Sequence, residues 1–182
     1  MGVALAPAAA RADEREGAFL GAGIGIGAMR FEEAGQELAA DDSMAMRILL
    51  GGMISPRLAL LVELDEMRGE APYDNQDGRF EVRQRSLTSG IRFWPWRRLW
   101  LQATVGRVWA TAHDPFLPGL VPDVWGDDAV DGTTLATGFG LEVLRDDAWS
   151  VDIALRGGGT EYRGSALSGG QASVGFAFHW FQ

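Results

Sequence analysis

The final eleven residues of the chain alternate large apolar side chains with small or polar ones. One face of an extended strand would carry Val174, Phe176, Phe178 and Trp180, and the opposite face would carry Ser, Gly, Ala and His. Successive side chains of a strand point to opposite faces of its sheet. Because similar segments recur along the chain, they can close into a sheet that is apolar outside and polar inside. Such a surface requires lipid, and ring closure satisfies the backbone hydrogen bonds there.

Alternation predicts about eight strands. Their expected ranges are 17–31, 43–54, 57–68, 80–94, 98–112, 133–144, 148–162 and 172–182. No run of about 18 apolar residues occurs, which excludes a transmembrane helix. Eight strands is the smallest size known for single-chain membrane barrels. The predicted fold class is therefore all-β, an eight-stranded antiparallel up-and-down transmembrane β-barrel.

The expected connections alternate in length. Short turns are expected at 54–57, 94–97 and 145–148, and long polar loops at 32–42, 69–79, 113–132 and 163–170. Outer-membrane barrels have short periplasmic turns and longer extracellular loops. This rule places both chain ends in the periplasm and the long acidic loops outside the cell.

Residues 1–12 differ in composition from the strands. They are rich in Ala and end in Ala10-Arg11-Ala12, which resembles a signal-peptidase site. We interpret them as the remnant of a signal peptide, with a disordered leader as the alternative, and residues 13–182 as the barrel domain. The chain has no Cys, so a disulfide framework and a thiolate metal site are excluded. A formal charge of −9 argues against nucleic-acid binding.

Charged residues also occur on the face expected to line the lumen. This predicted polar network consists of Arg47, Glu63, Asp65, Arg92, Glu142, Asp152 and Arg156. Enclosed charges must pair or meet water, and the two signs here are balanced enough to pair. Side chains just fill an eight-stranded barrel, so the expectation is a plugged polar lumen. An ion path gated by salt bridges is the alternative.

Aromatic residues concentrate near the predicted turns. The expected interfacial girdle consists of Trp94, Trp96, Trp109, Trp149, Phe178 and Trp180. Trp and Tyr are enriched where a membrane meets water, and barrels carry such girdles at both interfaces. Core Trp residues of a soluble sandwich would not be expected to gather beside turns.

Other motifs do not select a chemistry. Residues 23–28 fit GxGxxA, but their glycines alternate within a strand rather than opening a helix. Residues 74–78 lack the ligand spacing of a calcium loop. Nothing in the spacing joins His113 or His179 to a nucleophile and an acid. We therefore predict no catalytic, cofactor-binding or metal-binding residue, and no enzyme.

Three stretches resemble the small outer-membrane β-barrel proteins of the OmpA-like and OmpW-like families: GAFLGAGIGIGA, LLGGMISPRLALLVEL and VGFAFHWFQ. The resemblance extends over residues 17–182. It implies a porin-like, monomeric envelope protein in the outer membrane of a Gram-negative bacterium. The implied partners are outer-membrane lipid, lipopolysaccharide and the barrel assembly machinery. Such families usually end in an aromatic residue, whereas this chain ends in Gln182.

These observations predict an integral outer-membrane protein with a structural or surface-interaction role. The alternatives are a small-solute or ion channel of the OmpW-like type, a barrel enzyme that hydrolyses or acylates lipid A or phospholipid, and a soluble lipocalin-like binding barrel. A lipocalin-like barrel requires an apolar ligand cavity, whereas the expected lumen carries charge.

Overall fold

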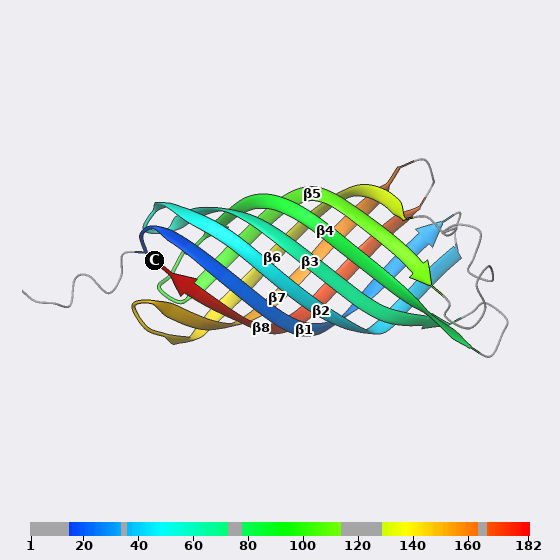
Figure 1. Cartoon of the computed structure of the whole chain (residues 1–182), viewed down its shortest axis with the longest axis horizontal. Helices are drawn as coiled ribbons and strands as arrows, with labels where there is room; N and C mark the ends of the chain where they lie inside the picture. Colours follow the sequence, from blue (N-terminus) through cyan, green and yellow to red (C-terminus); the bar gives the residue numbers. More distant parts are fainter. Residues whose placement is uncertain (1–14, 34–35, 73–77, 114–128, 164–166) are drawn as a thin grey trace, which may run out of the picture.

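The protein forms one closed barrel of eight antiparallel strands (Figure 1). The computed structural model describes residues 15–33, 36–72, 78–113, 129–163 and 167–182. The strands are β1 (Ala18–Glu33), β2 (Gln36–Ser55), β3 (Leu58–Pro72), β4 (Arg79–Phe93), β5 (Leu99–His113), β6 (Val130–Arg145), β7 (Trp149–Tyr162) and β8 (Ser168–Phe181). Each strand pairs with the next, and β8 returns to β1. The predicted fold class is confirmed.

The barrel closes through a long pairing of β1 with β8. The register runs from Phe19 opposite Phe181 to Glu32 opposite Ser168. β1 begins and β8 ends at the same end of the barrel, beside the short connections β2–β3, β4–β5 and β6–β7 (Figure 1). We call this end the turn end and the opposite end the loop end. At the turn end, Gly17 adopts a left-handed conformation with φ 76°, which glycine tolerates because it has no Cβ.

The strands extend further toward the loop end than the sequence predicts. A long loop is expected over 32–42, yet β1 continues to Glu33 and β2 begins at Gln36. That expectation is wrong. Likewise, β3 continues to Pro72. Residues 73–77, 114–128 and 164–166 of the other expected loops lie outside the described residues.

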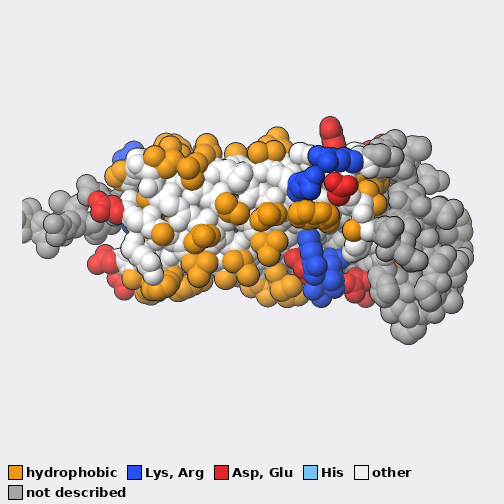
Figure 2. Space-filling model, turned by 45° about the horizontal axis from the view of Figure 1, so that its top comes forward, with side chains coloured by type: hydrophobic (Ala, Val, Ile, Leu, Met, Phe, Trp, Pro, Cys, Tyr) orange, Lys and Arg blue, Asp and Glu red, His pale blue; other side chains and the backbone are white. Residues whose placement is uncertain are grey.

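Exposed apolar side chains from all eight strands form a belt around the middle and the turn end of the barrel, and Figure 2 shows one face of it. Its large exposed side chains are Leu20, Ile24, Ile26, Met44, Met46, Ile48, Leu50, Leu60, Val62, Leu64, Leu87, Ile91, Leu101, Val105, Leu135, Phe139, Leu141, Ile153, Leu155, Val174, Phe176 and Phe178. Ile26 is 71% exposed and Phe176 is 60% exposed. Their inward neighbours are mostly small, polar or charged, in agreement with the predicted alternation.

The polarity of the two faces reverses toward the loop end. We call this part the loop-side extension; it comprises 29–33, 36–43, 66–72, 79–85, 107–113, 130–134, 160–162 and 168–171. Here the outward residues are mostly charged or polar, whereas the interior holds a cluster of buried apolar side chains. This cluster includes Met29, Phe31, Met67, Phe80, Val82, Val108 and Tyr162, with Ala45 packed at its lower edge. This reversal explains why the strands predicted from the sequence end too early. The alternation continues into the loop-side extension, but there the apolar residues face inward and the polar residues face outward.

No helix in the described part of the chain is long and apolar enough to cross a membrane.

Candidate functional site

The middle of the barrel encloses four charges of balanced sign. Arg47 Nε of β2 lies 3.0 Å from Asp65 Oδ2 and 3.5 Å from Glu63 Oε2, both on β3. Arg156 of β7 bonds the second oxygen of Glu63 from another side of the barrel, and its Nη1 lies 3.8 Å from Asp65 Oδ2. All four side chains are at most 10% exposed. Each charge therefore has an opposite partner within the barrel, which a buried ion requires.

Arg92 of β4 extends this cluster toward the turn end. Its Nε and Nη2 donate to Gln102 Oε1 at 3.0 and 2.8 Å, and Gln102 Nε2 donates to Glu63 Oε2 at 3.0 Å. Arg92 Nη1 lies 3.0 Å from His179 Nε2. Because guanidinium nitrogens only donate, His179 Nε2 must accept this hydrogen bond. The ring proton of a neutral His179 then lies on Nδ1, which is 3.1 Å from Asp152 Oδ2.

Two buried indoles bind the carboxylates nearest the turn end. Trp100 Nε1 donates to Asp152 Oδ2 at 2.6 Å, and Trp94 Nε1 donates to Glu142 Oε1 at 2.9 Å. Both indoles are 1% exposed. Each adds a second donor to a buried carboxylate oxygen, beside His179 Nδ1 at Asp152 and Arg15 at Glu142.

Arg15, just before β1, closes this end of the network. Its Nη2 donates to both oxygens of Glu142 at 2.8 and 2.9 Å and to the carbonyl oxygen of Arg97 at 2.7 Å. Its guanidinium carbon lies 4.5 Å from the centroid of the Trp94 ring, within cation–π range. Burial lowers the pKa of the Arg15 guanidinium, while the Glu142 carboxylate opposes that shift.

The expected girdle requires one correction. Trp94 points into the barrel and is not interfacial, because it follows Arg92 by two residues and shares its inward phase. The nearby turn conceals this phase in the sequence. The other girdle residues lie on the outer surface: Trp96, Phe178 and Trp180 are exposed, and Trp109 and Trp149 are half-buried. Trp149 also stacks on Phe178 with a centroid distance of 6.1 Å.

The structure places all seven residues of the expected lumen network inside the barrel. Six of them belong to the chain of contacts that runs from Arg47 to Asp152, and Glu142 pairs with Arg15 and Arg145 instead. The sequence interpretation missed the roles of Gln102 and Trp100, although both lie on the inward phase of β5. It also missed Arg15. This residue precedes the first alternating segment, so the alternation does not show whether its side chain points inward.

Inward glycines on β6 provide the space for two large side chains of this network. A Cβ built on Gly138 would lie 2.8 Å from Arg156 Cγ, and one on Gly140 would overlap the Trp100 indole. The polar interior therefore depends on these glycines as well as on the charges themselves.

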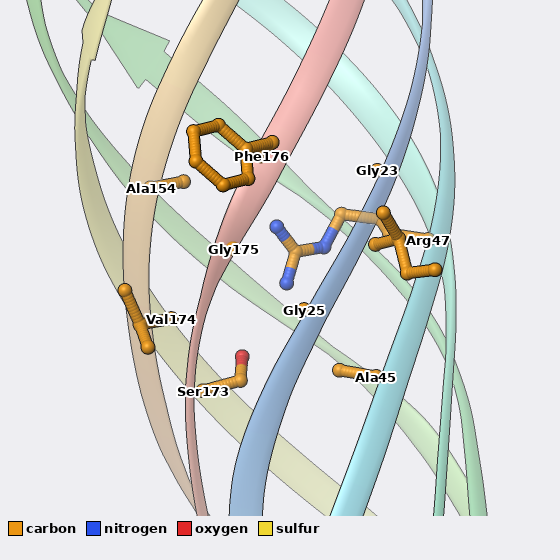
Figure 3. Close-up of a pocket in the computed structure, with 10 residues that line it drawn as sticks. Gly23, Gly25, Ala45, Arg47, Ala154, Ser173, Val174, Gly175 and Phe176 are labelled. Carbon is orange, nitrogen blue, oxygen red and sulfur yellow. The ribbon is translucent and has the colours of Figure 1, made fainter.

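The cavities beside the network are very small. One of about 20 Å³ is lined by residues that include Gly23, Gly25, Arg47 and Gly175. Figure 3 shows the Arg47 guanidinium pointing toward the wall where these glycines leave no side chain. A second cavity of about 10 Å³ lies beside Arg156. Holding one water takes roughly 10–15 Å³, so these spaces suit single waters rather than solutes.

Among the described residues there is no metal site, and Ser150 is not bonded to His179. No group of three His, Asp or Glu side chains among them could hold a metal ion. Ser150 Oγ donates to Asp152 Oδ1 at 3.0 Å, and its partner is therefore the acid rather than His179. A histidine that activates a serine must accept the proton of the serine hydroxyl. In His179 the accepting nitrogen, Nε2, already binds Arg92.

Comparisons with known proteins support the fold. No protein-family model matches the chain, and no curated protein matches its sequence. The structure is similar to Ail, the attachment invasion locus protein of Yersinia pestis, with a TM-score of 0.56 and 16% identity over 90% of this chain and 99% of that chain. It is similar to Neisserial surface protein A, with a TM-score of 0.53 and 14% identity over 89% and 96% of the two chains.

A third similar structure is the N-terminal β-barrel domain of OprF from Pseudomonas aeruginosa. Its TM-score is 0.51, with 11% identity over 91% of this chain and 99% of that domain. At these identities the likeness concerns the fold alone. The chain has the fold of the small eight-stranded outer-membrane barrels, as the resemblance in its sequence implied.

Proposed function

We propose that the protein is an integral outer-membrane β-barrel of a Gram-negative bacterium, with a structural or surface-interaction role and a lumen closed to solutes. The observation that carries this proposal is that the apolar belt has its polarity opposite to that of a soluble protein. Large apolar side chains lie outside and surround enclosed ion pairs. A contiguous apolar surface of this extent is unusual on a water-soluble monomer. In lipid it is the expected surface of a spanning barrel.

The contacts inside the barrel support a closed lumen. Glu63 is bonded from three directions, by Arg47, Gln102 and Arg156. Opening a path would separate these charges in an interior where each has little water to replace its partner. The cavities of about 20 and 10 Å³ beside the cluster leave no room for a hydrated solute.

The proposal includes partners and excludes catalysis. The belt contacts outer-membrane lipid and lipopolysaccharide, and the barrel assembly machinery recognises the aromatic residues of β8. The protein acts as a monomer and has no enzymatic activity. In support, His179 is enclosed and held between Arg92 and Asp152, where no lipid substrate reaches it.

Gel mobility with and without heating tests the membrane barrel. The full chain, folded in lipid vesicles, should migrate differently when it is loaded unheated. A chain that folds and stays soluble without detergent would instead support a lipocalin-like binding barrel.

Conductance across a planar bilayer tests the closed lumen. The folded chain should give no large, steady open steps. If the chain gives steady steps, and Gly138→Leu abolishes them by filling the interior, the protein is a channel of the OmpW-like type and the proposed structural role is wrong. Leu141→Val serves as the control, because Leu141 faces outward and its replacement leaves the lumen unchanged.

A further inference from the structure

A cluster of arginines lies on the outer wall where the apolar belt ends on the loop side. It consists of Glu66 and Arg68 of β3, Arg83 and Arg85 of β4, and Arg107 of β5, and we call it the arginine ledge. Leu64, Leu87 and Val105 are the exposed apolar residues that border it on the belt side. Figure 2 shows basic side chains gathered at this border.

Glu66 organises the ledge. Its Oε2 accepts from Arg85 Nε at 2.6 Å, its Oε1 accepts from Arg68 Nε, and Arg83 Nε lies 3.9 Å away. Arg68 and Arg85 bond Glu66 through their Nε atoms, and their terminal Nη groups donate no hydrogen bond to a described residue. Both side chains are partly exposed, at 43% and 51%.

Arg107 joins the ledge from the neighbouring strand. It pairs in register with Leu87, next to the pair formed by Arg85 and Trp109. Arg107 is exposed and makes no ion pair within the described part of the chain. Its guanidinium therefore has donors available on the same border of the belt.

The ledge carries an excess of positive charge. Four arginines meet two glutamates here, because Arg83 Nη2 also donates to Glu81 Oε1 at 3.3 Å. The local charge is therefore +2, in a chain whose formal charge is −9. Like charges on adjacent strands destabilise a sheet unless an anion offsets them. Other sectors of the same border are acidic, with Asp41, Asp42 and Glu161 facing outward. Four arginines are thus concentrated in one sector, whereas Arg30 of β1, elsewhere on the rim, is paired with Glu37.

We propose that the arginine ledge binds the phosphate group of a lipid headgroup in the outer leaflet. This inference rests on the proposed function, because it requires the belt to lie in a bilayer. Guanidinium groups bind phosphate with paired, charge-assisted hydrogen bonds. The ledge directly borders the belt, so acyl chains on Leu64 and Leu87 would place their own headgroup beside Arg85. Half-buried Trp109, next to Arg85, is the kind of aromatic residue that occupies this interface.

Lipid binding by ledge variants tests the inference. The folded full chain in nonionic detergent is titrated with bisphosphorylated lipid A, and bound lipid is counted by native mass spectrometry. The variant carries Arg68→Gln, Arg85→Gln and Arg107→Gln. The matched control carries Arg30→Gln, Arg57→Gln and Arg163→Gln, which removes the same charge from exposed sites elsewhere. We expect binding about tenfold weaker or more for the ledge variant and a change within about twofold for the control.

Dephosphorylated lipid A should bind the unaltered chain as weakly as the phosphorylated lipid binds the ledge variant. The inference is overturned if the ledge variant binds lipid A like the unaltered chain, or if removal of the phosphates leaves binding unchanged. It is also overturned if inorganic phosphate or a soluble sulfated oligosaccharide displaces lipid A at equal concentration, since the ledge would then take a soluble anion. Failure of the proposed function is separate, because the unheated gel shift would then be missing from every variant.

Discussion

The belt region and the loop-side extension use the same strands with opposite polarity. On β3, Leu64 faces outward beside inward Glu63 in the belt. Four residues further on, Arg68 faces outward beside inward Met67 in the extension. β4 repeats this change on the loop side of Leu87. The backbone alternation is the same in both regions. Strand geometry therefore fixes which side chains share a face, but it does not fix which face is apolar.

The two interiors are stabilised by different forces. Around Glu63, ion pairs and hydrogen bonds satisfy charges that water does not reach, and the large apolar side chains lie on the outside, where the proposed function places lipid. Around Met67, apolar side chains leave water for the interior, as in the core of a soluble protein. Variants that remove matched groups from each region can therefore separate these forces.

Removing one charge from the enclosed cluster should have the largest effect. Glu63→Gln removes one of the two carboxylates that Arg47 and Arg156 share and should lower the free energy of unfolding by about 4 kcal/mol. Glu37→Gln is the control, because its ion pair with Arg30 has a length of 3.0 Å but is exposed. The control should cost less than about 1 kcal/mol. Guanidinium unfolding in lipid vesicles, followed by Trp fluorescence, measures both; equal losses would contradict the distinction.

Truncation in the interior of the loop-side extension should come next. Met67 is 2% exposed within the apolar cluster, and Met67→Ala should lower the free energy of unfolding by about 3 kcal/mol through lost burial and a residual cavity. Met44→Ala, on the lipid-facing side, should cost clearly less. The same vesicle titration compares them. A smaller loss for Met67→Ala than for Met44→Ala would show that this interior is not a packed core.

A charge added to the outer face should lower the free energy of unfolding more in the apolar belt than in the loop-side extension. Leu60→Arg places a guanidinium in the apolar belt and should lower the free energy of unfolding by about 2 kcal/mol in lipid. Glu161→Arg, on the outer face of the extension, should change it by less than about 0.5 kcal/mol. Folded fractions in vesicles report both variants. If both are tolerated equally, the belt does not face lipid.

The smallest effect concerns the two tryptophans beside the β4–β5 turn. Trp94→Phe removes the donor to Glu142 and should cost about 1.5 kcal/mol, because a buried carboxylate oxygen loses a partner. Trp96 is 68% exposed, and Trp96→Phe should stay within about 0.5 kcal/mol. Vesicle unfolding compares the pair. A cost for Trp96→Phe that exceeds the cost for Trp94→Phe would contradict the inward placement.

Much of the fold could be predicted from alternation. The period of two is a local property of an extended chain, so it locates the strands and places residues such as Glu63 and Arg156 on the inward face. Its limits appear where the polarity changes. Residues 36–42 belong to β2 although the sequence predicts a loop there, because the pattern identifies a strand by its apolar outer face.

Alternation in the chain is enough to predict eight strands with their charges on the enclosed face, since side-chain direction along a strand depends only on neighbouring residues. It does not predict which enclosed groups meet: Arg156 reaches Glu63 across 93 positions of the chain, and Arg15 reaches Glu142 across 127. Those contacts depend on the register of every strand pair and on the curvature of the wall. Both are properties of the closed barrel as a whole, and no segment of the chain contains them.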